Sequence, residues 1–536
     1  MNRNIRKFVL KSEQGSFSAS YQLYKIYDEG IGVDANPVLA DKYKEVLSSQ
    51  LHTNNLRINS LKLNGFKGFD SVNIEFPKNS NVMVFVGNNG SGKSSILDAI
   101  KKCMTHTISR LATRSQNGEP IESLEINKLK QHSSINMTYD FGGVDFMMEI
   151  NASQHIDDSR LKSDYQGINE LGLLFRSVNS INPNTSFPIL AAYTVDRAND
   201  VTTKDIERSD EIINIQVWEK LRGYNKSLTG RADFKLFFRW VKELIEIENS
   251  DNAEVIALKE EIKSKEADLN NPLLLNILSK SNDDAAVNSL MNDYRKKIEK
   301  LKKRLNSYYN INTKTLSVVE KAIYSFLPGF SNLKLQRSPL DLLISKDDLS
   351  LSVLQLSQGE KTVLALVGDL ARRLTLLNPG LDNPLDGNGI VLIDEIDLHL
   401  HPTWQQKILQ RLTNVFPNIQ FIVTTHSPLV CHTIDAENIL LLKDSKIFNA
   451  PNGVRGAVSS WVLKNLFFVD ERPPEDEYTN ALKRYEELVY SNNYSSDECN
   501  SLYEKLVKHF GADYSVLVSA QLYIEGEEWE RQFDKD

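Results

Sequence analysis

Two patterns of apolar residues alternate along this chain, and together they predict an α/β fold. Short continuous apolar runs occur at residues 82–86, 389–393 and 421–423. Such runs are typical of strands that are buried on both faces of a parallel sheet. Helical segments are predicted at residues 94–104 and 362–377. The main body of the protein is therefore predicted to be a parallel sheet combined with helices.

The first fifty residues follow a helical pattern around a turn at residues 30–34. Apolar and small positions recur at helical spacing, at Ala19, Leu23, Tyr27, Ala40 and Tyr43. The pattern predicts a helical hairpin that resembles one Sel1-like repeat, a relative of the tetratricopeptide repeat. A single solenoid unit cannot bury its own apolar face, so it must pack on the main body of the protein or on a partner. We favour intramolecular packing or self-association over capture of a foreign peptide.

Changes of pattern along the chain divide it into five parts. Apolar and polar residues alternate at 56–69 and 71–76 and predict two strands around a glycine-containing turn. These strands begin the main body of the protein, which we call the head. A charged region with a helical stripe predicts a short hairpin insertion; the stripe consists of Leu290, Tyr294, Ile298, Leu301 and Leu305. The predicted parts are a helical element at 1–50, the two lobes of the head at 51–252 and 310–450, the insertion at 253–309 and a helical tail at 451–536.

Composition limits the classes of protein to which the chain can belong. Its 536 residues exceed what one compact core holds, and its net charge of -8 argues against a surface that binds duplex DNA everywhere. The three cysteines, Cys103, Cys431 and Cys499, are far apart, which excludes a disulfide scaffold and indicates reduced thiols. No apolar run approaches the roughly 20 residues that span a bilayer, and the first residues do not resemble a secretory leader. We expect a cytoplasmic protein without a membrane partner.

The strongest chemical signal is a complete GxxxxGK[ST] phosphate-binding loop between a buried strand and a helix. Its glycines allow backbone N–H groups to surround phosphate oxygens, while Lys93 reaches the β- and γ-phosphates of ATP and Ser94 binds Mg²⁺. A glycine-rich turn that arose by chance is the alternative, and the strand and helix around the loop disfavour it. The predicted nucleotide-binding residues here are Gly87, Asn88, Asn89, Gly90, Ser91, Gly92, Lys93, Ser94 and Ser95.

A second apolar strand, at residues 389–393, ends in the acidic pair Asp394 and Glu395. In a Walker B element, Asp394 would hold the Mg²⁺ shell and Glu395 would polarise the water that attacks the γ-phosphate. A strand followed by an acidic turn is the alternative for this segment alone. The phosphate-binding loop elsewhere in the chain favours the Walker B assignment.

Residues 354–361 precede a long helix, so Ser357 and the N–H groups after it lie at a helix amino end, which is a natural anion site. For the segment alone, an ordinary N-cap is the favoured explanation. Its LSQGE sequence resembles the signature motif LSGGQ of ABC ATPases: Ser357 and Gly359 are kept, whereas Gln358 and Glu360 depart from the motif. The resemblance implies that this segment binds the γ-phosphate of ATP held by a second subunit in a head-to-tail homodimer.

Two further segments extend this resemblance. His426 follows a buried strand and resembles the switch histidine that contacts the γ-phosphate in ABC ATPases, although a lone histidine is more often structural. Residues 394–402 resemble the DEPExHLHP segment of OLD-like and SMC-like ATPases, which places His399 and His401 in a loop that faces the dimer partner. A metal-binding histidine pair is the alternative that we weigh against this loop.

Two weaker assignments complete the predicted site. The FKGF sequence at residues 66–69 resembles a strand turn that lies near the nucleotide in SMC-like and OLD-like ATPases, where Lys67 would approach phosphate or base. Gln131 precedes a predicted strand and is our candidate for the glutamine that helps to bind the metal.

The resemblance covers about residues 56–445 and implies an ABC-type P-loop ATPase head. Together with the Sel1-like element, the short insertion and the tail, it identifies the chain as similar to the Septu-type PtuA ATPases associated with retrons. That family implies bacterial antiphage defence, in which PtuA pairs with the HNH nuclease PtuB. It also implies control by a retron reverse transcriptase and its multicopy single-stranded DNA (msDNA).

Two alternative functions remain beside this hypothesis. An SMC/Rad50-like DNA repair ATPase that acts with a nuclease is disfavoured because the insertion is too short for a long arm. A transporter subunit is disfavoured by the segment at 394–402 and by the Sel1-like element. The basic stripe of the insertion fits a solvated helix face better than a nucleic-acid contact; it consists of Arg295, Lys296, Lys297, Lys300, Lys302, Lys303 and Arg304. The sequence shows neither Toprim nor HNH nuclease features, so any DNA cleavage is assigned to a partner.

Overall fold

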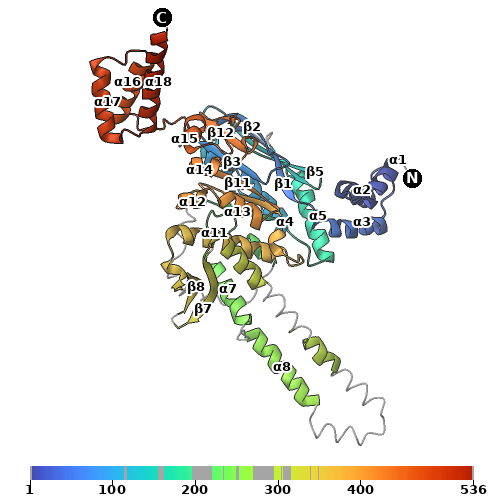
Figure 1. Cartoon of the computed structure of the whole chain (residues 1–536). Coiled ribbons are helices and arrows are strands. Elements are labelled where there is room, and N and C mark those ends of the chain that lie inside the picture. Colours follow the sequence, from blue (N-terminus) through green and yellow to red (C-terminus); the bar gives the residue numbers. More distant parts are fainter. Residues whose placement is uncertain are drawn as a thin grey trace, which may run out of the picture. The chain divides into compact units, whose positions relative to one another are not determined.

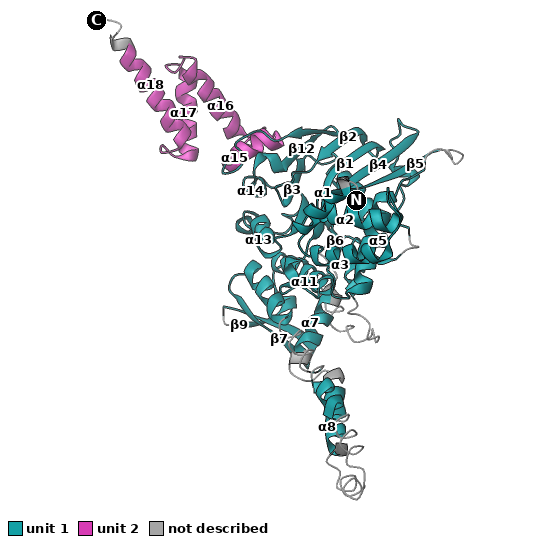
Figure 2. Ribbon diagram, turned by 90° about the vertical axis from the view of Figure 1, so that its right-hand side faces the viewer, with its two compact units in different colours: residues 1–457 teal, residues 458–536 magenta. Residues whose placement is uncertain are grey.

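The structure of the chain is a computed structural model. It describes residues 3–113, 117–154, 162–195, 220–232, 234–248, 253–269, 295–302, 305, 315–338, 340–347 and 349–533. These residues form two compact units, residues 1–457 and residues 458–536, which Figure 2 colours differently. The second unit begins at Val458, somewhat after the predicted start of the tail at residue 451.

A six-stranded sheet with the order β13-β12-β3-β11-β10-β6 forms the centre of the first unit (Figure 1). Neighbouring strands from β12 to β6 are parallel, and only β13 is antiparallel to its neighbour. The predicted α/β fold with a parallel sheet is therefore confirmed. The strands are β3 (Val82–Gly87), β6 (Ile189–Tyr193), β10 (Gly389–Ile393), β11 (Ile419–Thr425), β12 (Ile439–Lys443) and β13 (Lys446–Asn449).

A four-stranded antiparallel sheet with the order β2-β1-β4-β5 contacts the central sheet. Gln420 of β11 links the two, because its side-chain oxygen accepts a hydrogen bond from Ile58 N (2.7 Å) and its amide donates to Ile58 O (3.1 Å). The predicted strand pair at residues 56–76 is confirmed, with its turn at Lys67 and Gly68. The strands are β1 (Leu56–Phe66), β2 (Phe69–Glu75), β4 (His132–Phe141) and β5 (Val144–Ser153).

A third, three-stranded antiparallel sheet precedes the predicted signature segment. It consists of β7 (Phe330–Arg337), β8 (Leu340–Lys346) and β9 (Leu349–Ser352), in this order.

The helices of the first unit include the two that follow the phosphate-binding loop and the signature segment. The helix after the phosphate-binding loop, α4 (Lys93–Ala112), starts directly after Gly92, and α11 (Gln358–Leu377) starts after the N-cap Ser357. Both confirm helices predicted from spacing. Further helices of the head are α5 (Gln166–Ile181), α7 (Phe234–Glu248), α12 (Pro402–Gln405), α13 (Ile408–Val415) and α14 (Pro428–Cys431), and residues 315–326 are also helical. Single 3₁₀ turns lie at η1 (Ser123–Glu125), η4 (Lys220–Tyr224), η5 (Val353–Gln355), η6 (Pro384–Asp386) and η7 (Ala436–Asn438).

Three helices, rather than the predicted two, form the amino-terminal element: α1 (Arg3–Glu13), α2 (Phe17–Glu29) and α3 (Pro37–Gln50). The predicted hairpin corresponds to α2 and α3. These helices pack on the head of their own chain, since the ring of Phe17 meets that of Phe141 edge-on at 5.0 Å and Tyr21 donates to Glu170 at 3.0 Å. The element therefore buries an apolar face within the chain, as we expected for a lone repeat.

The insertion contains α8 (Ala253–Leu269) and a helical stretch at residues 295–302. Lys302 forms an ion pair with Glu266 at 2.7 Å, and Ile262 and Ile298 are buried, as in a helical hairpin. At 1.5 Å per residue, the 17 residues of α8 span about 26 Å. Four residues of the predicted stripes, Leu290, Tyr294, Lys303 and Arg304, lie outside the described residues.

The second unit is helical throughout its described part, residues 458–533. Its helices are α15 (Ser459–Val462), the π-helical turn η8 (Leu463–Phe467), α16 (Glu477–Tyr490), α17 (Asp497–Phe510) and α18 (Ser515–Phe533). A core of its own joins the last three helices, with Leu482, Tyr485, Leu506 and Leu517 fully buried.

The cysteines and the apolarity of the helices bear on the predictions made from composition. Cys103, Cys431 and Cys499 are free and buried, and burial raises the pKa of each thiol. None of the described helices combines the length and apolarity that crossing a membrane requires.

Candidate functional site

Three loops meet at one edge of the central sheet, because β3, β10 and β11 are parallel and their carboxyl ends lie together. The phosphate-binding loop follows β3, the acidic pair follows β10 and His426 follows β11. A cavity of about 410 Å³ opens between them, lined by Asn89, Gly90, Gly92, Lys93, Ser94, Ser95, Asp394, Glu395 and His426. The fold thus brings together residues that lie in three distant parts of the sequence.

The phosphate-binding loop is held close to the turn between β1 and β2. Gly92 has φ +105°, and a Cβ atom there would lie 2.5 Å from Cζ of Phe69, so only glycine fits this position. Lys93 Nζ donates to the carbonyls of Gly87 (2.8 Å) and Asn88 (3.0 Å), and the residue is 6% exposed. Burial lowers the pKa of Lys93, while Asp394 and Glu395 oppose this shift. Three of the predicted loop residues, Gly87, Asn88 and Ser91, do not line the cavity, and Ser91 is buried.

Asp394 joins the phosphate-binding loop to the sheet. Its Oδ2 accepts a hydrogen bond from Ser94 Oγ at 3.2 Å, and its Oδ1 accepts one from the hydroxyl of Thr424 on β11. Its backbone N–H donates to the carbonyl of Tyr193 on β6 at 2.8 Å. Three elements therefore fix the position of this carboxylate.

Glu395 adopts a left-handed backbone conformation, with φ +47°. This conformation costs a non-glycine residue about 1–2 kcal/mol, so the surroundings must impose it. The N–H of Glu395 donates to Thr424 Oγ1 at 2.7 Å, and the next N–H, of Ile396, donates to the Thr424 carbonyl at 3.0 Å. Thr424 therefore fixes the direction of the backbone at Glu395, where the chain leaves β10.

His426 is positioned through its neighbours. Asp397 Oδ1 accepts hydrogen bonds from the hydroxyl of Thr425 and, at 3.4 Å, from His426 N. Ser427 Oγ donates to Gln405 Oε1 at 2.7 Å. Our sequence analysis missed Thr424, Asp397 and Gln405. Asp397 lies within the segment at 394–402 that resembles DEPExHLHP, and the threonines directly precede His426, but the sequence analysis assigned a role to neither.

The predicted signature segment is a capped helix start. Ser357 Oγ accepts from Glu360 N at 3.3 Å, and Glu360 Oε2 accepts from Ser357 N at 2.8 Å. Lys346 pairs with Glu360 at 2.7 Å. Burial opposes ionisation of Glu360, but hydrogen bonds from Lys346 and Ser357 prevail and lower its pKa. Glu360, which departs from the LSGGQ motif, thus holds Ser357 in place.

A second cavity, of about 550 Å³, lies at this helix start and is lined by Ser357, Gly359, Glu360, His399, Leu400, His401, Thr403 and Trp404. A Cβ atom on Gly359 would lie 2.5 Å from the His399 carbonyl oxygen, so glycine allows the two loops to touch. None of these residues lines the cavity at the phosphate-binding loop. Among the described residues, His399 and His401 belong to no group of three or more His, Cys, Asp or Glu side chains that suits a metal ion.

A buried ionic cluster connects α11, the helix after the signature segment, to Asp394 at the end of β10. Tyr193, whose carbonyl holds Asp394, donates its hydroxyl to Asp369 of α11 at 2.8 Å. Arg372 and Arg373 each pair with Asp369 at 2.7 Å. Burial opposes ionisation of Asp369, but the two arginines lower its pKa. Hydrogen bonds and ion pairs within one chain therefore run from α11, which follows the signature segment, through Asp369 and Tyr193 to Asp394.

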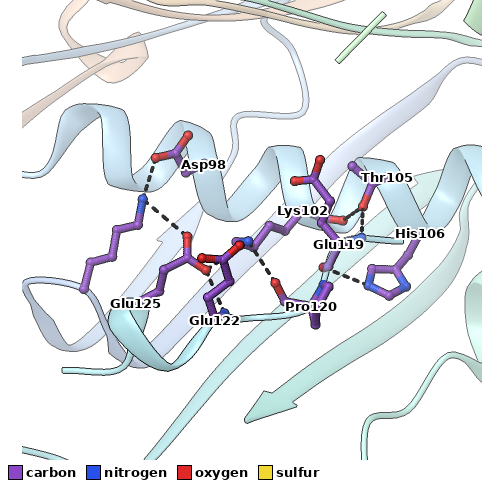
Figure 3. A network of polar contacts seen from close by, with 9 residues as sticks. Asp98, Lys102, Thr105, His106, Glu119, Pro120, Glu122 and Glu125 are labelled. Carbon is purple, nitrogen blue, oxygen red and sulfur yellow. Dashed lines mark hydrogen bonds and ion pairs between the residues drawn. The ribbon is translucent and has the colours of Figure 1, made fainter. Parts of the chain in front are cut away.

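Lys67 does not line the cavity at the phosphate-binding loop. Its Nζ lies 2.6 Å from Asp98 of α4 and 3.6 Å from Glu125, which also pairs with Lys102 at 2.9 Å. Figure 3 shows Asp98 and Lys102 along one helix with Glu125 beside them. The turn itself touches the phosphate-binding loop through Phe69, whereas its nearness to nucleotide and a contact between Lys67 and nucleotide stay predictions.

Gln131 lies just before β4 and is exposed. Its carbonyl accepts a hydrogen bond from Gln154 N at 3.0 Å, and it is not among the residues that line the cavity. The structure therefore does not bring Gln131 to Ser94 and Asp394, and its assignment as a metal ligand gains no support. Only a position before a predicted strand suggested it, and this strand belongs to the antiparallel sheet.

Comparisons with known proteins agree with this geometry. Residues 82–431 match the family described as "AAA domain, putative AbiEii toxin, Type IV TA system". The chain is 56% identical over 533 residues to the retron Ec83 probable ATPase of Escherichia coli, covering 99% of this chain and 98% of that protein. It is 31% identical over 507 residues to the retron Vc95 probable ATPase of Vibrio cholerae serotype O1 biovar El Tor, covering 90% and 93%.

More distant similarities cover less or are weaker. A match of 164 residues, 37% identical, links 29% of this chain to 22% of the Septu protein PtuA of Bacillus mycoides (strain KBAB4). A crystal structure of the Smc head domain from Pyrococcus furiosus aligns with 74% of this chain at 17% identity and a TM-score of 0.34, covering 96% of that domain. The family match and the two long alignments are decisive: the chain belongs to this AAA domain family and, over nearly its whole length, to the retron-associated probable ATPases.

Proposed function

We propose that this chain is the ATP-binding and ATP-hydrolysing regulatory subunit of a bacterial antiphage defence complex. The observation that carries the proposal is the cavity at the carboxyl ends of β3, β10 and β11. It collects Lys93, Ser94, Asp394, Glu395 and His426. A scaffold without nucleotide chemistry would not need these residue types at one point.

The donor set fits ATP with Mg²⁺. Ser94 Oγ and Asp394 Oδ2 are hard oxygen donors 3.2 Å apart, which is the chemistry that Mg²⁺ prefers. When bound, the ion would neutralise charge on the β- and γ-phosphates. Lys93 would leave its carbonyl partners for these phosphates, and the N–H groups at the start of α4 would face them.

Glu395 and His426 are assigned to the hydrolytic step. The carboxylate of Glu395 would accept a proton from the attacking water, and His426 would contact the γ-phosphate. Slow turnover suits a regulatory role, because the bound nucleotide then defines a lasting state of the protein.

The separation of the two cavities supports a homodimer. Ser357 and Gly359 line a cavity other than that of the phosphate-binding loop, so within one chain they do not face the same nucleotide. A second copy in head-to-tail orientation would place its signature segment over the first copy's ATP. Each dimer would then enclose two ATP molecules.

The partners are assigned from the relatives. The long alignments are with proteins named as retron probable ATPases, and the shorter one is with a protein named Septu PtuA. We propose an HNH nuclease of the PtuB type as the effector, restrained by a retron reverse transcriptase with its msDNA. The alternative, an SMC/Rad50-like repair ATPase, would need a longer arm than the roughly 26 Å of α8.

The test is reconstitution of the full chain with the nuclease, reverse transcriptase and msDNA encoded beside it. We expect one complex that contains all of them, and ATP-dependent control of DNA cleavage. Lys93→Ala should weaken ATP binding at least about tenfold, because a charged hydrogen-bond donor to phosphate is lost, and should remove ATP control of cleavage. Lys101→Ala, on the same helix, is the control. Unaltered ATP affinity after Lys93→Ala, or no association with the nuclease, would contradict the proposal.

A further inference from the structure

The last helix, α18, is apolar on two opposite sides. Its inner side contributes Leu517 and Ala520, both fully buried in the core of the second unit, and Gln521 donates to Tyr485 of α16 at 3.2 Å. The outer side carries Val518, Leu522 and Trp529, which are 41%, 62% and 63% exposed. Their spacing of four and seven residues places them in one line along the helix. We call these three residues the outer stripe.

Acidic residues surround the end of the outer stripe. Glu525, Glu527, Glu528 and Glu530 lie in the last turns of α18, and three of them are exposed. Carboxylates near a helix carboxyl end oppose the helix dipole, and like charges three positions apart repel each other. The folding of α18 does not explain this cluster, since it opposes helix stability. Binding to an oppositely charged surface does explain it.

The whole second unit shares this charge. Residues 458–536 contain seventeen acidic and eight basic residues, a net charge of -9. The chain as a whole has -8, so residues 1–457 carry a net charge of +1. The negative charge of the protein is therefore concentrated in this small helical unit.

We propose that the outer stripe and its glutamates form a docking surface for a basic protein surface with an apolar centre. Val518, Leu522 and Trp529 would supply the desolvated contact, while the glutamates would attract and orient the partner. A second copy of the same unit is disfavoured as the occupant, because two units of net charge -9 repel each other. A nuclease must carry positive charge to bind DNA phosphates, so the nuclease subunit is the occupant to which we commit. Its identity rests on the proposed function.

The experiment measures binding of the purified nuclease to the full chain by calorimetry at two NaCl concentrations. Two variants test the surface: Leu522→Ser/Trp529→Ser removes apolar contact, and Glu525→Lys/Glu528→Lys reverses charge. Leu10→Ser is the control, because Leu10 is 59% exposed on α1 of the other unit. We expect each double variant to weaken nuclease binding at least tenfold, with the ATPase rate within twofold of the parent. Binding by the parent should weaken as salt is raised.

Three outcomes overturn the proposal in distinguishable ways. Nuclease binding within twofold of the parent for both double variants shows that the partner docks elsewhere. Loss of self-association with unaltered nuclease binding shows that a second copy occupies the surface. A parental chain that binds ATP but no nuclease refutes the partner assignment of the proposed function, and this docking surface with it.

Discussion

The hydroxyl of Ser94 lies 3.2 Å from Oδ2 of Asp394, although 300 residues separate them in the chain. The contact joins the loop after β3 to the end of β10. It also places a hydroxyl and a carboxylate oxygen at the point where β- and γ-phosphates are expected.

Glu395→Gln should trap ATP. The amide keeps the size of the side chain but cannot accept the proton of the attacking water, so hydrolysis should fall by about 10²–10⁴-fold. ATP should still bind, and the dimer should accumulate in light scattering. Glu437→Gln, an exposed glutamate of the same unit, is the control. A parental hydrolysis rate in Glu395→Gln would show that another group is the base.

Thr424→Val should impair hydrolysis more than binding. Valine keeps the branched shape but removes the hydroxyl that donates to Asp394 and accepts from Glu395 N. Losing a buried hydrogen bond to a charged group costs about 1.5–3 kcal/mol, so the single-turnover rate should fall about 10- to 100-fold. Thr413→Val on α13 serves as the matched control. Equal losses in the two variants would mean that Thr424 has only a structural role.

Gly359→Ala should weaken ATP-driven dimerisation by roughly tenfold, because the added Cβ meets the His399 carbonyl at 2.5 Å and displaces one loop from the other. ATP binding to the single head should persist. Gly526→Ala on α18 is the matched control, since a Cβ there meets nothing within 4 Å. Sedimentation with ATP measures the dimer. Undiminished dimerisation of Gly359→Ala would exclude this segment from the interface.

Glu360→Gln should change the acid sensitivity of the fold. The folded pKa of Glu360 lies below its ordinary value of 4.5, so its charge contributes stability that is present above pH 4.5. This contribution disappears as pH falls through the folded pKa. At pH 7 the variant should melt about 1–3 °C below the parent, and the difference should close progressively as the pH falls below 4.5. A constant difference across this range would show that the charge of Glu360 is not responsible.

Local patterns were sufficient to predict the elements that carry the chemistry. The runs that became β3, β10 and β11 are continuous and apolar, as strands inside a parallel sheet must be. The sequence also located both helix starts, because α4 follows the phosphate-binding loop and Ser357 is a recognisable N-cap. The helix α1 was missed, since the spacing analysis began at Ala19 and the pattern of α2 and α3 already fitted a repeat.

The parts of the site that were missed depend on tertiary contacts. Thr424 bridges Asp394 and Glu395 only because β10 and β11 are neighbours in register. Asp397 reaches the loop of His426 for the same reason. Conversely, Gln131 precedes a strand as expected, but this strand belongs to a sheet whose edge does not lead to the cavity. The pattern of a strand indicates whether one or both of its faces are buried, but not where its ends lie relative to the cavity.

The position of β3 between β11 and β12 also has a consequence during synthesis of the protein. Both neighbours are made more than 300 residues after it, so at 5–20 residues per second a ribosome produces them about 15–60 s later. For this time the strand Val82–Gly87 has none of its final partners in the central sheet. A truncated or stalled chain would expose this apolar strand, and it would have no complete nucleotide site. The cavity at the phosphate-binding loop can therefore be completed only after His426 has been made.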